Sequence, residues 1–236
     1  MPLYAYVKAP PKRLCLPNKK LGRLSKILSL TFFGMGLFLV GQAVLPILSW
    51  YLILLPGYDS GIISPLGSTF PAFVRATEVD QNKPTSWFIG LQDKPQGEVK
   101  TYSLTIPKLK ITSARVELGG GNLNKALIAW PDSALPGNYG NNIIFGHSEL
   151  PQFASTKSYA GMFTFLMDLA QGDEVFLDYD NIRYRYLVID KYVVTPADLD
   201  VLEQRFDAAY VTLITCVPPG TVWKRGIVKA RLTPKP

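Results

Sequence analysis

The fold is decided by one stretch near the C-terminus, Val211–Arg225, which reads VTLITCVPPGTVWKR. Its first six residues form an apolar run of strand length that ends on Cys216, as is typical of a buried β-strand. The Pro-Pro-Gly sequence at 218–220 predicts a tight connection, and Arg225 opens the next strand. A thiol and a guanidinium are therefore expected at the adjoining ends of two neighbouring strands.

The chain contains a single histidine, His147, in the segment FGHS that follows another apolar run. A cysteine attacks a carbonyl carbon as its thiolate, which needs a nearby cation or base at neutral pH. The imidazole of His147 can transfer a proton to or from an amine. The guanidinium of Arg225 can stabilise an oxyanion. Together with Cys216, these groups are the parts of an acyl-transfer site.

Each of the three residues also has a structural interpretation when it is taken alone. A cysteine after an apolar strand is often inert core filling. A single histidine is often a satisfied core or surface residue, and an arginine after Trp-Lys is often solvated charge. Only their joint occurrence, together with the motifs around them, favours catalysis.

The net charge of +7 over 236 residues comes from the N-terminus. Residues 1–26 contain seven basic residues and no acidic one, which leaves 18 basic against 18 acidic residues in the rest of the chain. The basic balance therefore describes a tail and not a binding face. We expect no nucleic-acid partner.

An uncharged apolar segment, residues 27–55, follows this tail. A helix needs about 20 residues to cross the hydrocarbon core of a membrane. A cleaved signal peptide is the main alternative, but its apolar core is shorter, about 7–15 residues, and no clear A-x-A site follows. We expect a single-pass anchor in the cell membrane, with residues 1–26 as a cytoplasmic tail and the C-terminal part extracytoplasmic.

The two cysteines lie on opposite sides of this segment. Cys15 precedes the span and Cys216 follows it, so the two thiols cannot pair if the span crosses the membrane. An unpaired thiol in an extracytoplasmic domain is a candidate for reactivity.

Residues 56–99 are rich in proline and glycine and are predicted to be a linker, whereas residues 100–236 are predicted to form the β domain. The strands are expected around 102–106, 111–118, 142–145, 175–179, 183–189, 210–215 and 227–232, with a hairpin turn at Asp180-Asn181. Short helices are expected at 123–130, around 163–169 and at 196–202, the last capped by Thr195 or Asp198. Many short strands with few helices favour a closed barrel.

The motifs that carry the candidate site resemble those of the sortase family, the extracytoplasmic cysteine transpeptidases. The stretch TLITC at 212–216 is similar to the family signature Thr-Leu-x-Thr-Cys, and the segment 136–147 resembles the one that ends in the family's histidine. Arg225 lies where the family has its arginine. Weaker similarities are found at 106–111 and in the Gly-Asp pair at 172–173. The resemblance covers roughly residues 100–233.

This resemblance implies a mainly β protein with a closed eight-stranded barrel that cleaves a C-terminal sorting signal, similar to Leu-Pro-x-Thr-Gly, on secreted proteins. Cys216 would be the nucleophile that forms a thioacyl-enzyme, and His147 the acid/base. Arg225 would hold the substrate and the oxyanion, with Lys224 and Arg231 as alternatives, and Thr215 would add a substrate contact. The acyl group would pass to an amine of a cell-wall precursor or of a pilin lysine.

No cofactor or metal is expected. Four acidic residues between 173 and 180 would suit calcium, but a polar hairpin turn explains them more simply. Zinc is poorly supported by one histidine and one cysteine. Two alternatives for function stay open: a thiol hydrolase with the same site, and a non-catalytic barrel that binds peptides or cell-wall polymer.

Overall fold

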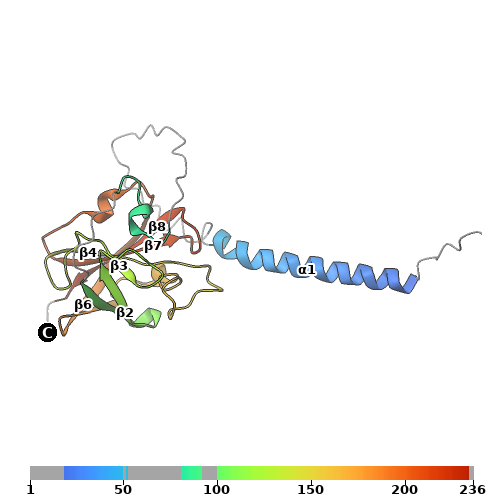
Figure 1. Cartoon of the computed structure of the whole chain (residues 1–236), viewed down its shortest axis with the longest axis horizontal. Coiled ribbons are helices and arrows are strands. Elements are labelled where there is room, and N and C mark those ends of the chain that lie inside the picture. The colour runs from blue at the N-terminus through green and yellow to red at the C-terminus, as the bar shows by residue number, and fades with distance from the viewer. Residues whose placement is uncertain (1–18, 50–51, 53–80, 92–99, 234–236) are drawn as a thin grey trace, which may run out of the picture. The chain divides into compact units, whose positions relative to one another are not determined.

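A computed structural model describes residues 19–49, 52, 81–91 and 100–233 (Figure 1). The chain divides into two compact units, with the boundary after Ala43. The N-terminal helix and the β domain are therefore described separately.

The N-terminal unit is built on helix α1, Lys19–Ser49. Within it, Lys26–Ser49 is 24 residues long and contains an 18-residue window with a mean hydropathy of 1.9, so the helix is long and apolar enough to cross a membrane, as a signal sequence can also be. The helix begins before the predicted anchor, residues 27–55. Apart from Leu52, the end of that anchor lies outside the described residues, as do most of the predicted tail, Cys15 and the greater part of the linker.

The β domain is a closed barrel with the strand order β1-β2-β3-β4-β7-β8-β6-β5. Most neighbours are antiparallel, but β2 pairs with β3 and β4 pairs with β7 in parallel. This confirms the predicted eight-stranded barrel. Its strands are β1 (Thr101–Ile106), β2 (Ile111–Leu118), β3 (Leu127–Ala129), β4 (Gly140–Phe145), β5 (Glu174–Tyr179), β6 (Ile182–Val194), β7 (Ala209–Val217) and β8 (Lys224–Leu232).

Short 3₁₀ helices are the only other regular elements in the described part of this domain. They are η2 (Pro84–Trp87), η3 (Pro107–Leu109), η4 (Leu166–Asp168) and η5 (Leu199–Leu202).

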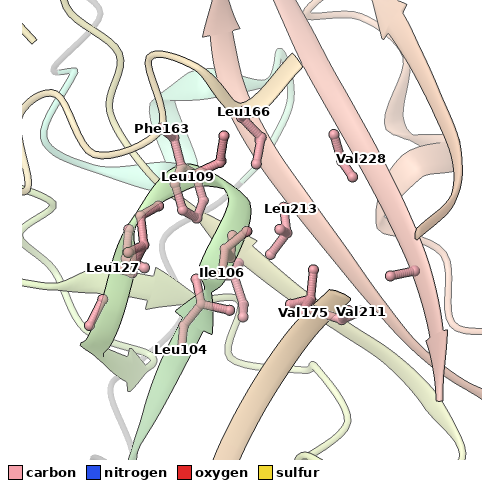
Figure 2. Packing of buried hydrophobic residues seen from close by; sticks show 14 of the residues in the cluster. Leu104, Ile106, Leu109, Leu127, Phe163, Leu166, Val175, Val211, Leu213 and Val228 are labelled. Carbon is pink, nitrogen blue, oxygen red and sulfur yellow. The ribbon is translucent and has the colours of Figure 1, made fainter. Parts of the chain in front are cut away.

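One hydrophobic core fills the inside of the barrel and receives side chains from all eight strands (Figure 2). Along β1, Tyr102, Leu104 and Ile106 point inward and alternate with more exposed residues, as a strand with one buried face should. Phe163 and Leu166, from the loop between β4 and β5, pack into the same core. The barrel interior is therefore occupied by side chains and is no channel.

A second core covers the outer face of β3, β4, β7 and β8. Every residue of β4 and β7 is buried, because one face of each strand packs inside the barrel and the other against this outer layer. The layer includes Trp87 and Phe88, from the segment before the barrel, together with Trp130 and Val201. The candidate site is built on this outer side.

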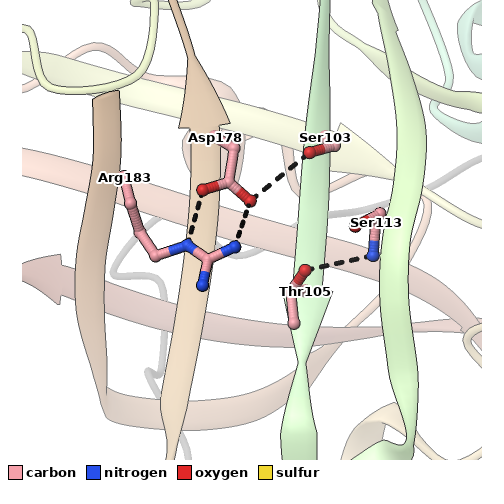
Figure 3. Close-up of polar contacts among 5 residues, drawn as sticks. All are labelled: Ser103, Thr105, Ser113, Asp178 and Arg183. Atoms are coloured by element: carbon pink, nitrogen blue, oxygen red, sulfur yellow. Dashed lines mark hydrogen bonds and ion pairs between the residues drawn. The ribbon is translucent and has the colours of Figure 1, made fainter. Parts of the chain in front are cut away.

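The hairpin between β5 and β6 turns on Asp180 and Asn181, both with positive φ (51° and 59°), as a two-residue turn of this kind requires. Beside it, Arg183 donates two hydrogen bonds to Asp178, which also accepts one from Ser103 (Figure 3). The predicted hairpin is confirmed.

Three of the four acidic residues between 173 and 180 bind basic side chains. Asp173 pairs with Lys108, Asp178 with Arg183, and Glu174 with Arg185. Within the described ranges, no group of three or more acidic, histidine or cysteine side chains is arranged to hold a metal ion. The calcium interpretation of these carboxylates therefore gains no support from their geometry.

Three of the predicted helices are wrong or shorter than expected. Residues 127–129 form strand β3, which β2 and β4 flank, and residues 123–125 form a turn. The apolar spacing that resembles a helix arises because Leu127 faces the inner core and Ile128 the outer one. Around 163–169, only η4 is helical.

The third helix is reduced to η5, and neither predicted cap serves it. Instead, the carboxylate of Asp198 accepts hydrogen bonds from the backbone N–H and the hydroxyl of Thr195. The two residues close a turn ahead of the helix and leave its N-terminus without a side-chain cap.

We expect Phe163→Ala to reduce the free energy of unfolding by about 4 kcal/mol, because its ring is fully buried in the inner core. Phe153→Ala is the matched control, since that ring is 71% exposed, and it should change stability by less than about 0.5 kcal/mol. Thermal unfolding of the full chain in detergent, followed by circular dichroism, measures both. Equal losses in the two variants would contradict this packing.

Candidate active site

The three predicted catalytic residues lie in one row, on β7, on β8 and just after the end of β4. In the parallel pair of β4 and β7, Phe145 is opposite Ile214, and two residues further along each chain come His147 and Cys216. In the antiparallel pair of β7 and β8, Cys216 is opposite Arg225. Residues far apart in sequence therefore meet at one end of the barrel wall.

The same row faces outward, away from the barrel interior. Side chains alternate between the two faces of a strand, and Phe145, Ile214 and Ile227 all belong to the outer core. Cys216 lies two residues from Ile214 and Arg225 two residues from Ile227, so both share that outer face. The thiol and the guanidinium thus approach each other over the outer surface of the sheet.

Cys216 is buried, with 6% of its surface exposed, and it is a free thiol. Burial raises the pKa of this thiol to about 11, while the charge of Arg225 acts in the opposite direction. The thiol is therefore protonated at neutral pH in this arrangement. Deprotonation needs a base or a change in the surroundings of the sulfur.

His147 follows β4 and is 9% exposed. Its imidazole lies 5.8 Å from the indole of Trp87, measured between ring centroids. Its carbonyl accepts a hydrogen bond from the backbone N–H of Phe163, at 2.9 Å. The histidine backbone is therefore tied to the inner-core loop, while the ring packs beside the outer aromatic layer.

Arg225 is almost completely buried, with 2% of its surface exposed. Its Nε and Nη2 donate to the carbonyl oxygen of Trp87, at 2.9 and 2.6 Å, and Nη1 donates to the carbonyls of Val222 and Lys224. The guanidinium also lies over the rings of Trp87 and Phe88, 5.6 and 6.0 Å from their centroids. Desolvation by burial lowers its pKa. Backbone carbonyls and π faces satisfy this cation.

The segment 81–91, which we call the strap, lies within the predicted linker, and the sequence does not predict that it belongs to the site. In the strap, Trp87 is 1% exposed and donates from its indole nitrogen to the carbonyl of Gln81. The adjacent aromatic residues Trp87 and Phe88 were the available signal, because two large aromatics in a polar stretch need a surface on which to pack.

The alternatives for the arginine do not occupy the row. Lys224 is opposite Val217 and is partly exposed, whereas Arg231 is opposite Tyr210, far along β8, and is exposed. Arg225 alone of the three is in register with Cys216.

His147 and Cys216 line one pocket of about 380 Å³. Its other walls are Gln81 of the strap, residues 148–150, Phe153 and the turn at Gly220 and Thr221. A thiol and an imidazole that share a pocket can form an acyl intermediate and move a proton to the departing group.

Comparison with known proteins matches this arrangement to one family. A family model described as Sortase domain matches residues 104–233, more than half of the chain. The chain belongs to the sortase family. No curated protein matches it.

Solved sortases have the same fold. Sortase C-1 from Actinomyces oris is 27% identical, with a TM-score of 0.50, over 57% of this chain and 73% of that one. A lid mutant of sortase A from Corynebacterium diphtheriae is 26% identical, with a TM-score of 0.51, over 60% of this chain and 74% of that one. The resemblance expected from the sequence motifs is thereby confirmed.

Two hydroxyl groups connect the ends of β4 and β7 in this sortase. Thr215 Oγ1 donates to the carbonyl of Gly146, at 3.1 Å, and Ser148 Oγ donates to the carbonyl of Cys216, at 2.7 Å. The substrate contact predicted for Thr215 stays a prediction, since its hydroxyl is engaged here with the chain itself. The two bonds fix the backbones on either side of His147 and Cys216.

The raised thiol pKa gives a prediction for alkylation of this sortase by iodoacetamide. In a Cys15→Ser variant, where Cys216 is the single thiol, we expect the rate to rise about tenfold per pH unit up to about pH 10, because only the thiolate reacts. In urea, which unfolds the chain, the alkylation rate of the same thiol should level off near pH 9, because a free cysteine has a pKa of about 8.5. A plateau below about pH 9 in the folded chain would contradict the raised pKa.

Proposed function

We propose that this sortase is a membrane-anchored cysteine transpeptidase that cleaves a C-terminal sorting signal, similar to Leu-Pro-x-Thr-Gly, and transfers the acyl part to an amine. The observation that carries this proposal is the row of His147, Cys216 and Arg225 beside one pocket. Membership of the sortase family supports a transpeptidase. The three residues of the row would supply its nucleophile, its proton carrier and its cation.

The first half of the reaction makes a thioester. Cys216 loses its proton to His147, and the thiolate sulfur attacks the carbonyl carbon of the scissile amide. The S–C bond forms, the C–N bond breaks, and the imidazolium returns the proton to the departing amine. The charge of Arg225 supports the thiolate and the oxyanion, because it faces Cys216 across the strand pair.

The second half transfers the acyl group. A neutral amine attacks the thioester carbon, its proton goes to His147, and the C–S bond breaks to regenerate the thiolate. The hydrogen bond from Ser148 to the Cys216 carbonyl supports the geometry, because it holds the cysteine backbone still while the sulfur changes partners.

Helix α1 provides the support for anchoring. Its segment Lys26–Ser49 has the length and composition of a membrane span, and the basic residues before it favour a cytoplasmic N-terminus with the barrel outside. The barrel would then lie on the outer face of the membrane. Both substrates are found there: secreted proteins with a sorting signal, and an amine acceptor in the cell wall or on a pilin.

The test uses the full chain in detergent and a pool of fluorogenic sorting peptides that vary at x and after Thr. We expect cleavage that yields an amide product when an amine is added. Cys216→Ala and His147→Ala should each lower cleavage by at least about a thousandfold, because they remove nucleophile and proton carrier.

Cys15→Ser is the matched control for removal of a thiol and should retain full activity. Cleavage that survives Cys216→Ala, or no cleavage of any peptide, would exclude this enzyme and favour the non-catalytic barrel. Cleavage whose products are the same with and without amine would favour the thiol hydrolase.

A further inference from the structure

The pocket beside Cys216 contains one acidic side chain, Glu149, two residues after His147. The other lining residues are neutral, apart from the titratable Cys216 and His147. Glu149 is half-buried, and no basic side chain pairs with it in the part of the chain that the structure describes. An unpaired carboxylate in a pocket with a nucleophile needs a chemical explanation.

Glu149 is held in a defined position. Its backbone N–H donates to Thr164 Oγ1, at 3.0 Å, and the same hydroxyl donates to its carbonyl, at 3.3 Å. Thr164 is itself buried, with 4% of its surface exposed. One carboxylate oxygen, Oε2, packs over Gly161, where a Cβ would approach it to 2.9 Å. These contacts hold Glu149 in a fixed position in the pocket wall.

The part of the wall next to Glu149 is also tightly packed. Gly220, with φ of +78°, packs so closely on Leu150 that a Cβ would lie 2.9 Å from its Cγ. This contact holds the turn between β7 and β8 against residues 148–150. Residues 148–150 and the turn at Gly220 are thus both anchored, and Glu149 and Cys216 line the same pocket.

The effect of a carboxylate here depends on whether it lies on the oxyanion side or on the amine side of the scissile bond. Next to the developing oxyanion, its negative charge would raise the barrier. On the amine side it lowers the energy of a bound ammonium group, since a charge-assisted hydrogen bond joins the two. By microscopic reversibility, the departing amine and the incoming amine use the same side of the thioester carbon.

We propose that this pocket is the acceptor site, and that Glu149 binds the acceptor as a primary ammonium ion. The inference rests on the proposed transpeptidase function. The bound ammonium loses one proton to solvent and a second to His147 as the C–N bond forms and the C–S bond breaks. The products are the new amide, the Cys216 thiolate, the imidazolium and one released proton, so atoms and charge balance.

The experiment measures how the thioester of the full chain in detergent divides between aminolysis and hydrolysis, as the ratio of amide to acid product. The acceptors are glycinamide, Nα-acetyl-lysinamide and hydroxylamine. The first two arrive largely as ammonium ions and represent a peptide N-terminus and a lysine side chain. Hydroxylamine is mostly uncharged at neutral pH and reports nucleophilic attack without ion pairing.

We expect Glu149→Gln to lower the product ratio about tenfold with the ammonium acceptors and less than about twofold with hydroxylamine, because one charge-assisted bond is lost. Glu149→Asp keeps the charge on a shorter side chain, so its product ratio with the ammonium acceptors should lie between those of the wild type and Glu149→Gln. The ammonium acceptor with the larger loss identifies the type of amine that the pocket fits.

Glu203→Gln is the matched control, because Glu203 is exposed and does not line the pocket. It should behave as the wild type. Equal losses with hydroxylamine and with the ammonium acceptors, or no loss with any of them, would overturn the acceptor site. If the wild-type chain forms no thioester, no product ratio can be measured, and the proposed transpeptidase function itself is excluded. That outcome is distinct from a failure of the acceptor site alone.

Discussion

The parallel pairing of β4 with β7 is the constraint on which the site depends. In this register, residues 145 and 214 are neighbours. His147 and Cys216, each two residues further along, therefore lie side by side. A slip of one residue would turn one of the two side chains to the barrel interior, because successive residues of a strand face opposite ways. Burial of both faces of β4 and β7 prevents such a slip, since each face has its own core.

The second determinant is the burial of a cation without a carboxylate. The guanidinium of Arg225 is removed from water and is stabilised by three backbone carbonyls and two aromatic faces. A buried charge is costly unless every donor is satisfied. The strap with Trp87 therefore belongs to the site: it supplies one of those carbonyls, packs beside His147 and belongs to the same outer core as Cys216.

Much of this arrangement could be read from local sequence. The alternation in β1, the Asp180-Asn181 turn and the apolar run ending at Cys216 each follow from short-range rules, and the family motifs identified the barrel. The short strand β3 could not be predicted, because a three-residue run that is buried on both faces has no period. The contact of Trp87 with Arg225 joins residues 138 positions apart, and only the closed fold brings them together.

The central claim, that this row of side chains forms one acyl-transfer site, is tested most directly by the intact mass of the full chain after incubation with a sorting peptide. The account predicts an added mass equal to the acyl fragment, located on the peptide that contains Cys216 and removed by hydroxylamine. An adduct on another residue, or an unmodified protein that nevertheless cleaves the peptide, would contradict it.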